Sequence, residues 1–175
     1  MRLKKSLTHQ FFTEGFRPKG GAGEAVAWLP LIAYMTGMRL EKIGPLIKDD
    51  IKRQDDIWFF NLNHVPQKEQ VLKKESSRCQ IPIHPRLVEL ELLDFVTSSN
   101  GRLFSMLSSA GARQLTASWS QWFGRYLRQV VGISDRRKIF HSFRHTFKDM
   151  WREAGISKDL HDRLSGHSSR DVGDG

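Results

Sequence analysis

A stripe of aromatic and aliphatic residues between positions 119 and 130 limits most strongly what this chain can fold into. Successive members are separated alternately by three positions and by one: Trp119, Trp122, Phe123, Tyr126, Leu127 and Val130. Residues three and four apart share one face of an α-helix. We therefore predict an amphipathic helix whose apolar face belongs to a protein core and not to a base-stacking platform.

Other patterns predict a mainly helical domain with a small antiparallel β-sheet, an α+β fold. A helical pattern begins at Glu24, and Pro30 is expected to kink that helix or to mark a restart. Aromatic and β-branched residues predict two strands that form a hairpin or small sheet, over 57–62 and 78–83. Further helices are expected over about 40–44, from Pro85, over 141–154 and over about 157–164, with Gly155 as a left-handed cap after the third.

Length, charge and cysteine content narrow the class of protein. The 175 residues suffice for one sizeable core, and the net charge of +9 indicates either a polyanionic partner or a protein that is merely basic. The longest apolar stretch is too short to span a bilayer, so we expect neither export nor a membrane. A single cysteine, Cys79, excludes an intramolecular disulfide and a cysteine-cluster zinc site, which favours an intracellular location.

The segment HSFRHTF, at 141–147, carries the clearest chemistry. On a helix, His141, Arg144 and His145 project from neighbouring positions. A metal site would use the two histidines but would place a guanidinium beside the cation, and a purely structural role would bury His145. The third interpretation is an anion site, in which these side chains stand at a helix N-terminus whose backbone N–H groups also attract negative charge.

Four segments together resemble those of one enzyme family. They are TGMR at 36–39, LKKESSRCQIPIHP at 72–85, HSFRHTF at 141–147 and LSGHSS at 164–169. In order and approximate spacing they are similar to the motifs of the tyrosine recombinase (phage integrase) catalytic domain. The family breaks a DNA strand by attack of a tyrosine on the scissile phosphate and needs no cofactor or metal. The resemblance implies the integrase catalytic core fold over residues 24–175, after a basic arm and Gly-rich loop at 1–23 and without the family's N-terminal clamp domain.

The resemblance implies a catalytic role for each matched residue. Arg39 and Arg144 would grip the non-bridging oxygens of the phosphate as bidentate donors. His141 would accept the proton of the attacking tyrosine, and His167 would donate a hydrogen bond to the phosphate. Lys73 would protonate the leaving 5′-oxygen.

Other matched residues have supporting roles. A one-residue slip in the alignment would replace Lys73 by Lys74 as the general acid, and His145 would be a structural histidine on the packed side of its helix. The residues expected to contact DNA are Arg39, Lys73, Lys74, Arg78, Arg144 and Ser168.

Two departures from the family pattern affect what we expect. Lys42 stands where the family usually has an acidic residue, with Glu41 just before it. The family's tyrosine follows shortly after the position of His167, but this sequence ends at Gly175 and its two tyrosines, Tyr34 and Tyr126, belong to core-facing patterns. We therefore expect a monomeric fragment that binds double-stranded DNA without cutting it.

Two other functions remain open alongside a strand-transferase domain. One is a type IB topoisomerase-like domain, which shares the fold and chemistry. The other is a non-catalytic DNA-binding remnant of a mobile element. The partners expected for a recombinase are duplex DNA and sister integrase protomers in the full-length complex. We expect the protein to be cytoplasmic and encoded by a bacterium or a phage.

Overall fold

The computed structural model describes residues 14–62, 79–107 and 115–157. Its elements, in chain order, are α3 (Ala25–Thr36), α4 (Leu40–Ile43), a short 3-10 helix (Lys48–Asp50), β1 (Ile51–Gln54), β2 (Ile57–Asn61), β3 (Gln80–Pro82), α5 (Pro85–Glu89), α6 (Leu92–Ser98), α7 (Ala117–Gln129) and α8 (Ser142–Glu153). Within these ranges no helix is long and apolar enough to cross a membrane. The predicted arm at 1–23 lies outside the described residues up to residue 13.

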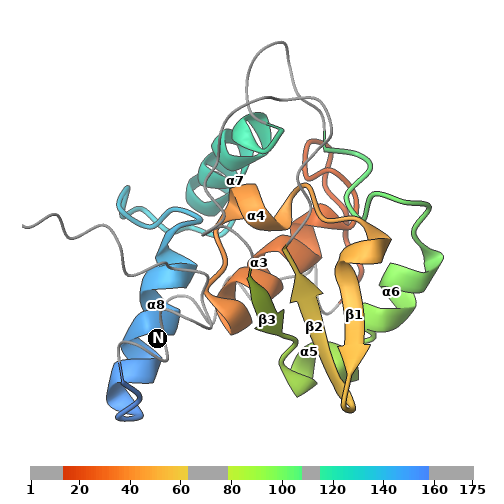
Figure 1. The fold of residues 1–175 in the computed structure, drawn as a ribbon. Coiled ribbons are helices and arrows are strands. Elements are labelled where there is room, and N and C mark those ends of the chain that lie inside the picture. Colours follow the sequence, from red (N-terminus) through yellow and green to blue (C-terminus); the bar gives the residue numbers. More distant parts are fainter. Residues whose placement is uncertain (1–13, 63–78, 108–114, 158–175) are drawn as a thin grey trace, which may run out of the picture.

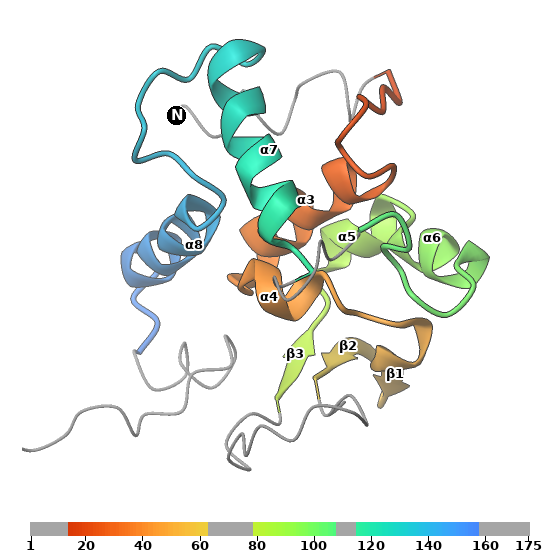
Figure 2. The same cartoon turned by 90° about the horizontal axis from the view of Figure 1, so that it is seen from above.

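Helix α3 forms the centre of the molecule, with α8 on one side and α5 and α6 on the other (Figure 2). Its residues are apolar on nearly every face, and ten of the twelve are buried. A helix that is apolar all round is stable only when other elements surround it. The predicted restart at Pro30 is wrong, because α3 continues through this residue as one helix.

The sheet has the strand order β1-β2-β3, and both pairs are antiparallel (Figure 1). Phe60 is the central core residue, paired with Ile51 on one side and Ile81 on the other. The predicted pairing of 57–62 with 78–83 is confirmed. Strand β1 was not predicted, because its three polar residues after Ile51 hide the alternation. The hairpin that joins β1 to β2 turns at Asp55 and Asp56, both of which have positive φ, 48° and 63°.

The helix predicted from Pro85 is divided into α5 and α6. His84 caps α5, because its Nδ1 accepts the Arg86 backbone N–H at 3.0 Å, and Pro85 occupies the first turn. Glu91 adopts a left-handed conformation, with φ of 66°, and this ends one helix before the next begins. Leu87 and Leu92 are buried on either side of the break, so the turn lets both helices face the core.

The aromatic stripe of α7 packs into the core, as predicted. Trp119 and Phe123 stack with ring centroids 5.0 Å apart, and Phe140 meets both rings edge-on. Phe140 precedes α8, so these contacts join α7 to the start of α8. Val130 is the exception in the stripe, because it caps the helix and is 57% exposed.

Helix α8 ends close to the predicted position. Gly155 follows it with φ of 71°, which confirms the left-handed cap. The helix predicted over about 157–164 lies outside the described residues from 158 onward. The fold therefore agrees with the mainly helical α+β prediction in the parts of the chain that bear on the site.

Candidate functional site

A pocket of about 190 Å³ lies where the junction of α3 and α4 meets the start of α8. Both segments that line it belong to motifs singled out in the sequence, and α7 adds one hydroxyl. The lining residues are Met38, Arg39, Leu40, Glu41, Ser120, Ile139, Phe140, His141 and Arg144. The pocket therefore brings three of the predicted site residues together.

The TGMR segment forms the C-terminal cap of α3 and the turn that follows it. Gly37 has φ of 66° and caps the helix by donating its N–H to the Ala33 carbonyl at 2.9 Å. The Thr36 hydroxyl, which is buried, donates to Ile32 O at 2.6 Å and accepts the Met38 N–H at 3.2 Å. This turn leaves Arg39 in an extended conformation at the start of α4, with its side chain exposed at the pocket.

Helix α8 locks onto this turn through two contacts at Gly37. The Arg144 guanidinium donates a hydrogen bond to the Gly37 carbonyl, and Arg144 is only 4% exposed. A Cβ atom at Gly37 would lie 2.5 Å from Cδ1 of Phe147, so only glycine fits between the two helices. The first and third sequence motifs are therefore parts of one structural unit, although 107 positions separate Gly37 from Arg144.

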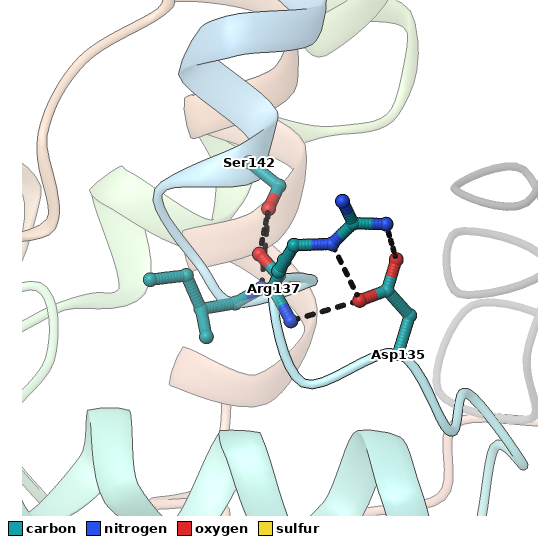
Figure 3. A network of polar contacts seen from close by, with 4 residues as sticks. Asp135, Arg137 and Ser142 are labelled. Atoms are coloured by element: carbon teal, nitrogen blue, oxygen red, sulfur yellow. Dashed lines mark hydrogen bonds and ion pairs between the residues drawn. The ribbon is translucent and has the colours of Figure 1, made fainter.

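The turn before α8 is held by a polar network around Ser142 (Figure 3). The Ser142 hydroxyl accepts the Ile139 N–H at 3.1 Å and donates to the Arg137 carbonyl at 3.2 Å. Asp135 accepts both the backbone N–H and the guanidinium of Arg137. These bonds fix the backbone that carries His141 into the pocket.

One feature of the predicted anion site is corrected by this turn. The backbone N–H groups of residues 142, 143 and 144 donate to the carbonyls of residues 139, 140 and 141, at 3.0–3.1 Å. The tight turn therefore occupies the N–H groups that were expected to receive an anion. The positive character of the pocket comes instead from side chains, chiefly Arg39 and Arg144.

His141 stands at the N-cap of α8 and is electrostatically tuned by its neighbours. Partial burial of the ring lowers its pKa, and the positive charges of His145, Arg144 and Arg39 lower it further, while Glu41 opposes them. The shift leaves His141 neutral at neutral pH. A neutral imidazole in this position can accept a proton from a group that enters the pocket.

His145 does not have the packed position that was predicted for it. It is exposed, and its ring lies edge-on to His141 with the centroids 5.0 Å apart. The packed side of α8 is occupied by Phe143, Arg144 and Phe147, all buried. Because His145 lies one position beyond Arg144, the helix turns it away from that side and onto the flank of His141.

The structure also locates Lys42, which departs from the family pattern, and Glu41, which precedes it. Glu41 lines the pocket, so a carboxylate stands beside Arg39 and His141. Lys42 is exposed and acts on the Cys79 thiol, whose pKa burial raises and Lys42 lowers. The acidic group at the pocket is therefore one position earlier than in the family pattern.

Five of the predicted site residues belong to the second and fourth motifs. Lys73, Lys74, Arg78, His167 and Ser168 lie outside the described residues, and their roles stay predictions. The residues that sequence reasoning missed are Ser120, an exposed serine on α7 with no distinguishing pattern, and Ser142, which stood unassigned inside HSFRHTF. A serine at the start of a predicted helix was the available signal, since such residues often hydrogen-bond nearby backbone groups.

Both tyrosines of the sequence lie in described parts of the chain, away from the pocket. Tyr126 is buried at 6% exposure, and the Tyr34 hydroxyl lies 3.7 Å from the Met150 sulfur. Neither is among the residues that line the pocket. In the described ranges there is also no group of three or more His, Cys, Asp and Glu side chains that could hold a metal ion. The described residues that line the pocket therefore include two arginines and a histidine but no tyrosine.

Comparisons with known proteins bear on the fold. A scan against protein-family models and a search of curated proteins find no match. Among solved structures, the chain is similar to the XerH site-specific recombinase bound to its difH substrate in a pre-cleavage complex, with a TM-score of 0.62, 16% identity, and coverage of 95% of this chain and 45% of that one. A post-cleavage complex of XerH with palindromic difH gives the same TM-score and identity, with 96% and 45% coverage. The chain has a tyrosine recombinase-like fold and spans less than half the length of these recombinases.

Proposed function

We propose that this domain binds duplex DNA and holds the phosphate of the strand to be cut in the pocket between Arg39, His141 and Arg144. The observation that carries the proposal is the meeting of two guanidinium groups and a neutral imidazole in one small pocket, supplied by distant segments. Arginine suits a phosphate because its planar fork donates two parallel hydrogen bonds. The basic net charge, +9, and the likeness to a DNA-bound recombinase support DNA as the source of that phosphate.

The reaction that we propose for this site is strand cleavage and rejoining through a 3′-phosphotyrosyl intermediate. A tyrosine phenol loses its proton to His141, and its oxygen bonds to phosphorus as the bond to the 5′-oxygen breaks. Arg39 and Arg144 stabilise the negative charge that grows on the non-bridging oxygens. The family resemblance assigns Lys73 or Lys74 as donor of the proton that the 5′-oxygen takes up, and His167 as a further phosphate contact.

The tyrosine is the component that this pocket lacks, since neither Tyr34 nor Tyr126 lines it. We propose that the nucleophile comes from outside these 175 residues, in the whole recombinase or from a sister protomer. The same observation favours a second candidate function, a DNA-binding remnant of a mobile-element integrase that no longer cuts. Both candidates require the pocket to bind a DNA phosphate, and both predict that this chain forms no covalent DNA adduct.

Binding of a fluorescently labelled duplex, followed by anisotropy at several salt concentrations, tests the proposal. We expect affinity to fall steeply with salt, and Arg39→Ala to weaken it about 10- to 100-fold because a charge-assisted phosphate contact is lost. Arg39→Lys keeps the charge but not the fork, and should recover only part of this loss. Arg152→Ala is the matched control, because Arg152 is also exposed but lies at the far end of α8.

The outcomes separate a phosphate pocket from a merely basic surface. Equal losses for Arg39→Ala and Arg152→Ala, or full recovery by Arg39→Lys, would contradict the pocket. A denaturing gel of the same mixtures should show no protein-linked DNA strand. A covalent adduct that disappears with Tyr34→Phe or Tyr126→Phe would show that the site contains its own nucleophile.

A further inference from the structure

A basic turn precedes the pocket along the chain and has no role in the function proposed so far. It consists of Arg136, Arg137 and Lys138, and the next residue, Ile139, lines the pocket. We propose that Arg137, oriented by Asp135, contacts a second phosphate of the bound duplex beside the pocket. This inference rests on the proposed function and adds a DNA contact outside the motifs that suggested it.

Asp135 holds Arg137 by one edge of its guanidinium. Its carboxylate accepts hydrogen bonds from Nε and from Nη2, each at 3.1 Å, and also accepts the backbone N–H of Arg137 at 3.0 Å. A guanidinium has five N–H donors, so the edge formed by Nη1 and the second Nη2 hydrogen points away from this carboxylate. The Arg137 side chain is 90% exposed, and that edge is accessible to a phosphate from solvent.

The turn is also fixed relative to the pocket. The Arg137 carbonyl accepts the Ser142 hydroxyl, and the same hydroxyl accepts the Ile139 N–H (Figure 3). Ser142 is the first residue of α8 and is 9% exposed, so the network lies against the core. A phosphate bound by Arg137 would therefore have a defined position relative to His141 and Arg144, which the same helix end carries.

The charge balance of the turn favours an anionic ligand. Arg137, through its hydrogen bonds and its charge, lowers the pKa of Asp135, and the charge of Lys138 lowers it further. Asp135 is therefore ionised at neutral pH and opposes three neighbouring cations, which leaves the turn positively charged. Asp135 acts as a positioning residue, because it already restricts the Arg137 side chain before DNA binds. The conformational entropy that Arg137 loses on contact with a phosphate is therefore smaller.

Arg137→Ala and its neighbour Arg136→Ala give a matched comparison, since both remove one exposed positive charge from the same turn. With the labelled duplex and the full 175-residue chain, we expect Arg137→Ala to weaken binding about 10-fold and to reduce the salt slope by about one. Arg136→Ala should weaken binding less than threefold, as expected for loss of long-range attraction alone. Equal effects of the two variants would overturn the proposal.

Asp135→Asn tests the positioning role. The amide oxygen can still accept the Arg137 backbone N–H, but the ionic hold on the guanidinium is lost. In an Arg137→Ala background, Asp135→Asn removes only a negative charge that repels DNA, so it should raise the affinity for the duplex. With Arg137 present, the gain in affinity should be smaller, because the Arg137 guanidinium is no longer oriented. The same gain in both backgrounds would show that Asp135 does not act through Arg137.

The experiment distinguishes failure of this inference from failure of the proposed function. If the chain binds duplex DNA and Arg39→Ala weakens binding, but Arg137→Ala and Arg136→Ala are alike, only the second phosphate contact is wrong. If the chain shows no salt-dependent DNA binding, both are wrong. Thermal unfolding of each variant confirms that it is folded, which we expect because both arginine side chains are exposed.

Discussion

Replacing Gly37 by alanine should destabilise the fold severely, because the added Cβ atom would cause both backbone strain and a steric clash. Alanine at φ of 66° is in the left-handed region, which costs a non-glycine residue about 1–2 kcal/mol. The added Cβ would also lie 2.5 Å from Cδ1 of Phe147, and overpacking of a core costs about 1–3 kcal/mol. We therefore expect a loss of about 2–5 kcal/mol in the free energy of unfolding, the sum of these two terms.

Gly155→Ala is the matched control for the backbone term. Gly155 has φ of 71° and also follows a helix, but nothing lies within 4 Å of its hypothetical Cβ. Its loss should be about 1–2 kcal/mol, from backbone strain alone. Urea unfolding, followed by tryptophan fluorescence, should lower the midpoint by about 1–2.5 M for Gly37→Ala and about 0.5–1 M for Gly155→Ala, with an m-value of about 2 kcal/mol/M. Equal shifts would refute the close packing of α3 against α8.

Two further predictions concern the start of α8. Ser142→Ala should lower the free energy of unfolding in urea by about 1–2 kcal/mol, because the Ile139 N–H loses its acceptor. Thr146→Ala is the control and should lower it by less than about 0.5 kcal/mol, because the Thr146 hydroxyl donates to a carbonyl of its own helix. Similar losses would contradict the role of the network. Stability should also rise with pH just below the ordinary His pKa of about 6.5, because the unfolded chain binds a proton there more readily than folded His141 does. The urea midpoint measured from pH 5 to 7.5 should depend less on pH in His141→Gln, and an unchanged slope would show that the pKa of His141 is not lowered.

The sequence predicted those elements whose residue pattern is determined mainly by the burial of an apolar face. The α7 stripe and the paired strands 57–62 and 78–83 follow from burial of apolar faces, which periodicity reports directly. The interruption at Glu91 and the hairpin at Asp55 and Asp56 depend on left-handed backbone conformations at acidic residues, which single-sequence patterns indicate weakly. The uninterrupted course of α3 through Pro30 depends on tertiary packing that outweighs the local cost of proline.

The site was predictable in composition but not in detail. The motifs identified Arg39, His141 and Arg144 as partners, and the pocket brings them together. Which side of α8 packs against the core decides that Arg144 is buried against Gly37 and that His145 is exposed. The sequence pattern was compatible with more than one orientation of this helix. The occupied N–H groups at the start of α8 depend on the Ser142 turn, which no sequence periodicity reports.

The most direct test of the account is the pKa of His141 measured by NMR with and without a saturating DNA duplex. A phosphate in the pocket would place negative charge beside the imidazole, which favours its protonated form, so we expect the pKa of His141 to rise on binding. A rise in the pKa of His141 that Arg39→Ala abolishes would support the phosphate pocket. Bound DNA that leaves the pKa of His141 unchanged would contradict it.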